Sequence, residues 1–489
     1  MTNLGKNYQA LHLVIIVFLI LLGISFIPVE GELWGVELKQ INLFSDLTYE
    51  EEEYEEDANF DWGTEEDIQE KNNDNIQEES DDSLSLNFSD KYVISLAGAG
   101  FSLDVTNHLL NFLDNENSKI DNFLTAPTQP KIKKEIEGNT AQMKYFFDAL
   151  KKAKTSKVRI AHYGDSQIEG DLVTATLRET FRADFGGVGV GYLALTSQDV
   201  TFRSTTKHEY NESKWLTGSV FAGNEHNLPY GMGGESFIPE AGAWVSFKPT
   251  NRQKSTSKFK EAYLIYSDYK KGDLDYSIDN GAKESLKLVK SGDFEMATIK
   301  AGKSARSIKI EAPQKLDANL YGIFLEDGNG VYVDNYPLRG NSGEDLGKIP
   351  LKTLEAINKF REYNLVIFQF GKNAISGNYK RYEREMVKVI EGYKKAMPNT
   401  SFLMISVQDT GFKTSPRMLN LLKSQQNIAK EANIAFWNLF EAMGGKNSMA
   451  KWVKNNPPLA SADHTHFNLT GAEIVGEMMA EAIIDLYNK

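Results

Sequence analysis

Residues suited to acyl transfer occur in two segments that lie far apart in the sequence. The segment Arg159–Asp171 reads RIAHYGDSQIEGD, so Ser166 follows a buried-strand pattern and a Gly-Asp turn. A side chain there would lie at the carboxyl edge of a sheet, where open α/β sheets bind ligands. The helix predicted from about Asp171 would offer N–H groups to an oxyanion. The turn is equally compatible with Ser166 as an ordinary helix N-cap.

A second polar segment, SADHTHFNLTG, precedes the last predicted helix. It contains Asp463 and His466, three residues apart. A serine nucleophile needs an imidazole base, and the imidazole needs an acceptor that fixes its tautomer. One turn can supply both the acceptor, Asp463, and the base, His466. His464 directly follows Asp463 and therefore does not have this spacing. The alternative is a polar loop with an incidental histidine pair.

Two further segments suit an oxyanion hole. Gly371-Lys372-Asn373 follows the buried-strand pattern LVIFQF, and the Asn373 amide could donate to an oxyanion. The segment RGNSG follows a strand-like run at Val331–Val333, and its Gly343 would allow a substrate to approach the backbone closely. Each segment alone is weak evidence, because Gly-Asn turns are common.

Composition excludes several classes of function. The sequence has no cysteine, which excludes disulfides, thiol nucleophiles, thiolate metal sites and a lipoprotein anchor. It has no His-Glu-x-x-His motif, so we predict no metal and no cofactor. The net charge of −14 is concentrated between Glu50 and Asp82, and no basic stripe with interleaved aromatics occurs. We therefore predict that the protein does not bind nucleic acid.

The N-terminus predicts a membrane anchor within residues 1–30. Leu13–Val29 is apolar apart from three residues and is near the short end of the range for a membrane span. Lys6 precedes it and Glu30 follows it, which orients the rest of the chain outside the cytoplasm. A cleaved signal peptide is the alternative. We expect a membrane-anchored protein with a periplasmic or extracytoplasmic catalytic part.

The rest of the chain divides into four predicted parts. Residues 31–91 are an acidic disordered linker, and 92–194 hold an N-terminal extension and the first part of an α/β domain. Residues 195–335 carry short strand-like runs separated by turn residues, which predicts an inserted antiparallel β-sandwich or jelly roll. The α/β pattern returns over 336–489.

The order of these segments resembles the SGNH (GDSL-like) hydrolase family: GDS, a glycine, Gly-x-Asn and a final Asp-x-x-His. The resemblance covers residues 158–194 and roughly 331–489. It implies a flavodoxin-like three-layer α/β fold and assigns Ser166 as nucleophile, His466 as base and Asp463 as its orienter. It implies that Gly343 and Asn373, with the Ser166 N–H, form the oxyanion hole.

The position after Asn373 departs from the family, where it is often acidic, because it is Ala374 here. That departure concerns the local loop and none of the catalytic roles.

The inserted β domain gives a closer resemblance, to peptidoglycan O-acetylesterases with a carbohydrate-binding-like insert. This implies hydrolysis of O-acetyl groups on a cell-envelope glycan. The alternatives are an O-acetyltransferase with the same residues and a non-catalytic glycan-binding envelope protein. In the insert, aromatic residues could stack on sugars or form the core: Trp215, Tyr230, Trp244 and Tyr263.

Overall fold

The computed structural model describes residues 32–33, 36–37 and 132–489, except 198, 202 and 376. The predicted anchor at residues 1–30 and most of the predicted linker at 31–91 lie outside the described residues. Within that linker, β1 (Glu32–Leu33) and β2 (Val36–Glu37) pair in antiparallel. Over the described ranges, no helix has both the length and the apolar character of a membrane span.

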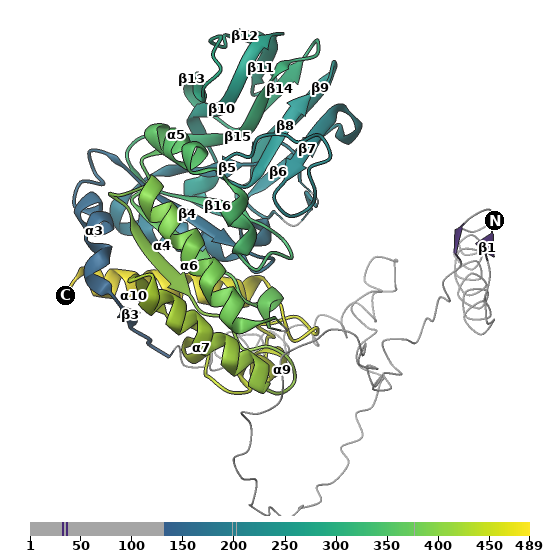
Figure 1. Ribbon diagram of the computed structural model, residues 1–489. Helices are drawn as coiled ribbons and strands as arrows, with labels where there is room; N and C mark the ends of the chain where they lie inside the picture. The colour runs from purple at the N-terminus through teal and green to yellow at the C-terminus, as the bar shows by residue number, and fades with distance from the viewer. Residues whose placement is uncertain (1–31, 34–35, 38–131, 198, 202, 376) are drawn as a thin grey trace, which may run out of the picture. The chain divides into compact units, whose positions relative to one another are not determined.

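A six-stranded sheet is the centre of the α/β domain (Figure 1). Its order is β16–β4–β17–β18–β19–β3, and all pairs are parallel except β19 with β3. The strands are β3 (Ile136–Gly138), β4 (Lys157–Gly164), β16 (Gly330–Pro337), β17 (Leu365–Gln369), β18 (Ser401–Ile405) and β19 (Ala435–Trp437). Counted along the chain, the parallel strands have the 2-1-3-4-5 order of flavodoxin-like sheets. This confirms the predicted α/β fold class.

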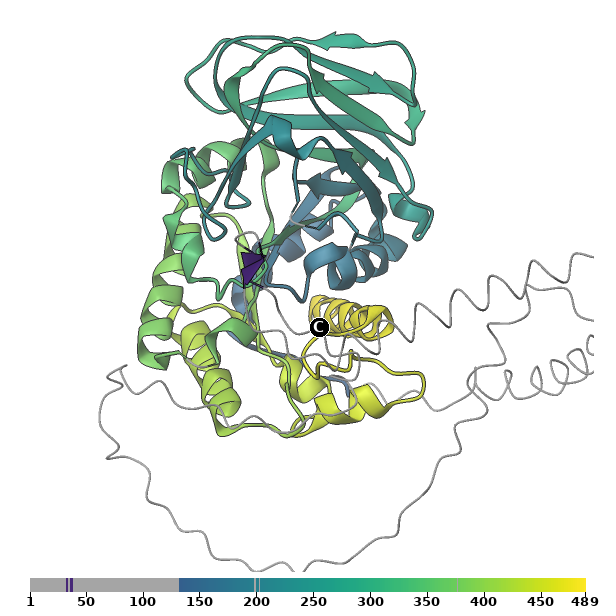
Figure 2. The same cartoon turned by 90° about the vertical axis from the view of Figure 1, so that its right-hand side faces the viewer.

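Helices cover both faces of this sheet (Figure 2). One face packs against α3 (Lys144–Leu150), α4 (Leu172–Phe185), α8 (Leu439–Ala442), α9 (Ser448–Lys454) and α10 (Leu469–Tyr487). The other face packs against α5 (Leu351–Arg361), α6 (Tyr379–Ala396) and α7 (Pro416–Glu431). Because both faces are covered, β17 and β18 are buried at every residue.

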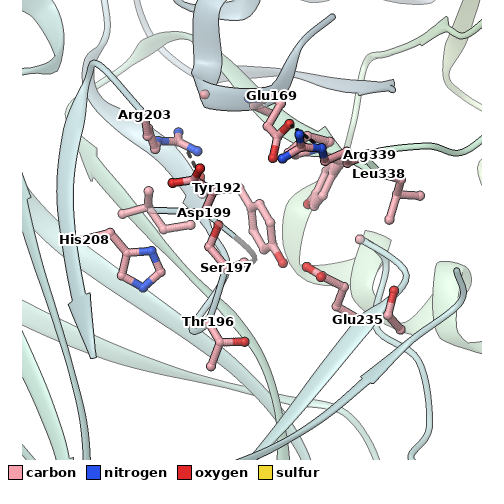
Figure 3. A pocket seen from close by; sticks show the side chains of 18 of the residues that line it. Glu169, Tyr192, Thr196, Ser197, Asp199, Arg203, His208, Glu235, Leu338 and Arg339 are labelled. Carbon is pink, nitrogen blue, oxygen red and sulfur yellow. Dashed lines mark hydrogen bonds and ion pairs between the residues drawn. The ribbon is translucent and has the colours of Figure 1, made fainter. Parts of the chain in front are cut away.

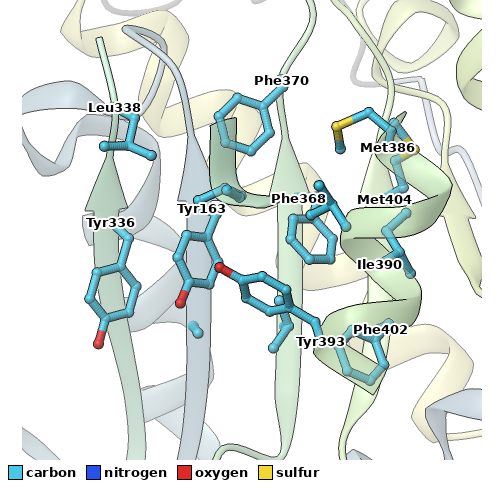
Figure 4. Close-up of a cluster of buried hydrophobic side chains, with 14 of the residues drawn as sticks. Tyr163, Tyr336, Leu338, Phe368, Phe370, Met386, Ile390, Tyr393, Phe402 and Met404 are labelled. Atoms are coloured by element: carbon cyan, nitrogen blue, oxygen red, sulfur yellow. The ribbon is translucent and has the colours of Figure 1, made fainter. Parts of the chain in front are cut away.

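Aromatic side chains fill much of the core beneath α6 (Figure 4). Tyr163 of β4 stacks on Tyr336 of β16 with ring centroids 4.9 Å apart, and Tyr393 of α6 meets Tyr163 edge-on at 5.5 Å. Burying such rings contributes strongly to stability, and the edge-on geometry suits their quadrupoles. This packing fixes the carboxyl ends of β4 and β16 relative to each other.

Two antiparallel sheets form the insert and share one apolar core. The first sheet contains β5 (Val188–Leu193), β7 (Trp215–Ser219), β8 (Glu235–Pro239), β10 (Phe259–Lys271), β13 (Glu295–Ala305) and β15 (Asp317–Asp327). The second contains β6 (Thr206–Tyr210), β9 (Ala243–Pro249), β11 (Leu274–Ile278), β12 (Glu284–Leu286) and β14 (Ile308–Ala312). The predicted antiparallel insert is therefore present.

The ends of the insert differ from the predicted 195 and 335. β5 already pairs with β15 in antiparallel, so the inserted sheet begins at Val188. β16 pairs in parallel with β4 from Gly330 onward and belongs to the α/β domain. The sequence did not reveal this, because a buried strand has the same apolar pattern in either sheet.

A buried ionic cluster joins the insert to the α/β domain. Glu326 of β15 binds Arg361 at 2.5 Å, Lys157 at 2.9 Å and Arg159 at 3.2 Å. Arg361 also binds Asp334 of β16 at 3.0 Å. Burial raises the pKa of Glu326, but the three cations outweigh burial and lower it overall. Glu326 is therefore an ionised carboxylate shared by the two domains.

Candidate active site

Ser166 lies in a tight turn at the carboxyl end of β4. The N–H of Gln167 donates to the Asp165 carboxylate at 3.0 Å, and the N–H of Ile168 donates to the Asp165 carbonyl at 3.3 Å. A 3₁₀ turn, η4 (Glu169–Asp171), separates this turn from α4. Asp171, not Ser166, occupies the N-cap position of α4. The structure therefore excludes the alternative that Ser166 is a helix N-cap. It also differs from the expectation that the N-terminus of α4 would lie directly behind Ser166.

His466 and Asp463 form a hydrogen-bonded series with Ser166. The Ser166 Oγ lies 2.9 Å from His466 Nε2, and His466 Nδ1 lies 2.6 Å from Asp463 Oδ2. The backbone N–H groups of Thr465 and His466 donate to Asp463 Oδ1 at 2.9 and 3.0 Å. These distances are within the range for proton transfer between a nucleophile and its base.

Asp463 and His466 remain open to solvent, with side chains 48% and 43% exposed. Partial burial raises the pKa of Asp463, but hydrogen bonds from the His466 ring and backbone and from Thr465 lower it overall. An ionised Asp463 accepts from Nδ1–H and leaves Nε2 as the acceptor for a serine proton. The series can therefore perform general-base chemistry on a ligand that approaches from solvent.

His464 takes no part in this series. Its side chain is buried, its φ is +51°, and its ring lies 3.9 Å from the ring of Phe412. Its carbonyl accepts from the N–H of Gly411 at 2.8 Å. His464 therefore fixes the loop that presents His466.

Gln167 links the turn that carries Ser166 to the loop that carries His466. Its side-chain amide donates to the Thr465 carbonyl at 2.9 Å, so the Ser166 turn binds the His466 loop. Asp165 is fully buried beside it. Burial raises the pKa of Asp165 to about 6, whereas N–H groups of Gln167 and Gly371 act in the opposite direction. Neither residue was predicted to have a role, although both lie in the GDSQ segment.

The two predicted side-loop oxyanion donors meet at Asn341. The Asn373 amide donates to the Asn341 carbonyl at 3.1 Å, and the Gly343 N–H donates to Asn341 Oδ1 at 2.5 Å. Asn373 lies on η8 (Lys372–Ala374), which forms despite the unusual Ala374. In this structure the Gly343 N–H is thus engaged with a side chain. Asn341 lies in the segment RGNSG, but no local pattern in the sequence indicates that it would bridge both loops.

Gly343 has a structural requirement of its own. Its φ is +98°, and an added Cβ would lie 2.9 Å from Met386 Sδ and 3.0 Å from a ring carbon of Phe370. The backbone conformation therefore favours glycine, and a Cβ would also displace the end of the Met386 side chain.

The insert reaches this side of the sheet through the loop after β7. Lys348 of η7 (Glu344–Lys348) donates to the Val220 carbonyl at 2.9 Å. A Cβ on Gly340 would lie 2.8 Å from the Phe221 ring, so Phe221 packs on the loop that carries Gly343. The insert therefore contacts the predicted oxyanion loop.

Comparison with known proteins identifies the fold. No protein-family model matches the sequence, and no curated protein matches it significantly. The structure is similar to a solved peptidoglycan O-acetylesterase, with a TM-score of 0.57 and 19% sequence identity. The match covers 72% of this chain and 98% of that chain. The chain therefore shares an SGNH-like α/β fold with that protein.

Smaller solved proteins match only part of this chain. Esterase EstA from Pseudoalteromonas sp. has 17% identity and a TM-score of 0.26, covering 32% of this chain and 80% of its own. A putative GDSL-like lipase from Parabacteroides merdae has 17% identity and a TM-score of 0.25, covering 32% and 74%.

In the part of the chain that the structure describes, no group of three or more His, Asp or Glu side chains could hold a metal ion.

The structure also shows where the four aromatic residues that could stack on sugars lie. Trp215 lies in the insert core, and Lys309 lies 4.9 Å above the ring of Trp244. Tyr263 donates to Glu261 at 2.5 Å beside the ionic cluster, and Tyr230 is half-buried against the α/β core.

Proposed function

We propose that the protein is a serine esterase that removes O-acetyl groups from a cell-envelope glycan such as peptidoglycan. The observation that carries this proposal is the Ser166–His466–Asp463 series, with its 2.9 and 2.6 Å contacts. It lies at the carboxyl edge of the sheet, beside the point where the strand order reverses between β4 and β17. The SGNH fold shared with a peptidoglycan O-acetylesterase supports the choice of an ester substrate.

The proposed reaction proceeds through a covalent acyl-enzyme. His466 Nε2 takes the proton from Ser166 Oγ, which attacks the acetyl carbonyl. The tetrahedral intermediate collapses, the C–O bond to the sugar breaks, and His466 returns its proton to the departing sugar oxygen. A water molecule then gives a proton to His466 and attacks the acetyl carbonyl of the acetyl-serine. The bond between that carbonyl and Ser166 Oγ breaks, acetate leaves, and His466 returns the proton to Ser166 Oγ.

The proposed oxyanion hole consists of the Ser166 and Gly343 N–H groups and the Asn373 amide. Asn373 has two amide hydrogens, and only one is needed for the Asn341 carbonyl. The Gly343 N–H is held by Asn341 Oδ1 at 2.5 Å, so in this proposal it shares its hydrogen with the oxyanion or leaves Asn341 when substrate binds.

The decisive experiment incubates the full-length protein with p-nitrophenyl acetate and with O-acetylated peptidoglycan, without any other acceptor. We expect acetate release from both, and its loss in Ser166→Ala. Acetyl transfer only after an acceptor sugar is added would contradict hydrolysis and favour an O-acetyltransferase. No acetyl release under either condition would contradict an enzyme and favour a glycan-binding role.

We also propose that residues 1–30 anchor the protein in a membrane, with the catalytic part outside the cytoplasm. The support is the apolar run at Leu13–Val29 with Lys6 before it and Glu30 after it. Fractionation of expressing cells tests this, together with protease added to intact spheroplasts. Retention of the full chain in the soluble cytoplasmic fraction would contradict the proposal.

A further inference from the structure

A pocket lies between the insert and the α/β domain, beside the candidate active site (Figure 3). Its lining includes Glu169 of η4, three residues after Ser166, and Arg339, four residues before Gly343. These two residues form an ion pair at 3.7 Å. The insert contributes Glu235 at the start of β8. The pocket thus touches both the nucleophile segment and the oxyanion loop.

Glu235 is an unusual lining residue. Figure 3 shows its carboxyl group directed into the pocket, toward Tyr192. Within the described part of the chain, no hydrogen bond or ion pair reaches this carboxyl group. Burial raises the pKa of Glu235 to about 8. A carboxyl group that keeps its proton at neutral pH can both donate and accept a hydrogen bond.

Two further polar atoms at this pocket lack a partner among the described residues. Asn335 is 0% exposed and donates to the Ile168 carbonyl at 2.9 Å, but its Oδ1 accepts nothing. Arg203 forms an ion pair with Asp171 at 3.4 Å, but its Nε–H is unpaired. Buried polar groups in proteins are almost always hydrogen-bonded. The pocket therefore offers three groups to a ligand: the acceptor Asn335 Oδ1, the donor Arg203 Nε–H, and the Glu235 carboxyl group, which can donate and accept.

The size and charge of the pocket limit the occupant. The cavity is about 90 Å³, which leaves room for a small polar group. Arg203 is paired with Asp171, and Glu169 with Arg339. With Glu235 protonated, the charged groups that line the pocket are two carboxylates, of Glu169 and Asp199, and two guanidinium groups, of Arg203 and Arg339. Their charges cancel, so the pocket suits a neutral group. Such a group must offer one donor and one acceptor on a small scaffold.

We propose that this pocket is a substrate subsite for the acetamido group of an N-acetylated amino sugar, which deepens the esterase function proposed above. The acetamido N–H matches Asn335 Oδ1, and its carbonyl matches the Arg203 Nε–H. Glu235 takes an adjacent sugar hydroxyl. The apolar surfaces of Tyr192 and Leu338 are available to the methyl group. Binding there fixes the sugar beside Ser166 without any part in bond cleavage.

Direct binding tests this subsite independently of esterase activity. Calorimetric titration of the full-length protein with tri-N-acetylchitotriose is compared with cellotriose, which has a hydroxyl in place of each acetamido group. We expect cellotriose to bind at least tenfold more weakly. Equal binding of the two, or no binding of either, would overturn the subsite. Tighter binding of the deacetylated, cationic chitotriose would also overturn it, because an amine requires an ionised Glu235.

Variants locate the binding in the pocket. We expect Glu235→Ala to weaken tri-N-acetylchitotriose binding at least tenfold and Glu235→Gln, which keeps a donor and an acceptor, to change it less than threefold. Ala222→Trp fills the pocket from an exposed lining position and should also abolish binding. Glu212→Ala, exposed elsewhere on the insert, is the matched control.

Turnover of p-nitrophenyl acetate separates this proposal from the esterase function. It should be unchanged in all four variants, because that substrate has no acetamido group. Unchanged sugar binding in both Glu235→Ala and Ala222→Trp would overturn the subsite while leaving the esterase proposal intact. Conversely, sugar binding without any esterase activity would contradict the proposed function alone.

Discussion

The side-chain amide of Asn373 donates to the backbone carbonyl of Asn341 at 3.1 Å. This contact joins the loop after β17 to the loop after β16, on opposite sides of β4. Asn341 also receives the Gly343 N–H on its side chain and donates to Asp345 at 3.1 Å. The two proposed oxyanion loops are therefore one connected structure, organised by a residue with no proposed contact to substrate.

Asn373→Ala removes a proposed oxyanion donor and the tie between the loops. We expect kcat on p-nitrophenyl acetate to fall about 10²–10³-fold with little change in KM, as when one oxyanion donor is lost. Asn427→Ala, an exposed amide that binds Glu383 on the surface, is the matched control and should be neutral. A fall in KM and kcat of similar size, or no fall in kcat, would show that Asn373 does not contact the transition state.

Ser166→Ala and His466→Ala should each reduce turnover by several orders of magnitude, because residues of a triad act as a unit. His464→Asn should be mild, since Asn tolerates the positive φ at this position and keeps the carbonyl that Gly411 binds. Steady-state kinetics and circular dichroism of the purified variants check both points. If Ser166→Ala keeps more than about a tenth of wild-type activity, the nucleophile assignment is wrong.

Glu326→Gln should destabilise the protein strongly. It leaves Lys157, Arg159 and Arg361 without their shared carboxylate, and removing one member of a buried ion cluster typically costs about 3–5 kcal/mol. Denaturant unfolding measures the loss. Glu261→Gln, which weakens partly exposed contacts to Lys157 and Tyr263, should cost less than about 1 kcal/mol. Equal losses of unfolding free energy in the two variants would mean that burial does not strengthen the ion pairs of Glu326.

The same carboxylate makes stability depend on acidity. Because the pKa of Glu326 is lowered in the folded protein, its stabilising effect is present above the ordinary glutamate pKa and is lost as the pH falls below it. We expect the free energy of unfolding to fall less steeply in acid for Glu326→Gln than for wild type. Parallel acid profiles of the two proteins would contradict the lowered pKa.

Glu235 should change the pH dependence of stability in the opposite direction to Glu326. Burial raises its pKa to about 8, so between the ordinary glutamate pKa and about 8 the unfolded chain has lost a proton that the folded chain keeps. Stability should therefore decrease as the pH rises through this window. Thermal melts of wild type and Glu235→Gln across this range check the sign. An equal pH dependence in both proteins would show that Glu235 is ionised when folded.

The sequence determined the local elements and the order of the chemical segments. Buried-strand patterns predicted β4 and β17 within a few residues, and Asp463 and His466 were paired by their spacing within one turn. Local periodicity and turn chemistry are encoded by neighbouring residues, so they can be read from a single chain.

Tertiary structure decided which distant segments meet. Whether β5 pairs with β15, and whether Asn341 bridges Gly343 and Asn373, depends on contacts between segments far apart in the chain. The pocket around Glu235 likewise exists only because β8 of the insert packs beside the loop after β16. The pKa of Glu235 follows from that burial, and no local pattern encodes the loss of solvent around a side chain.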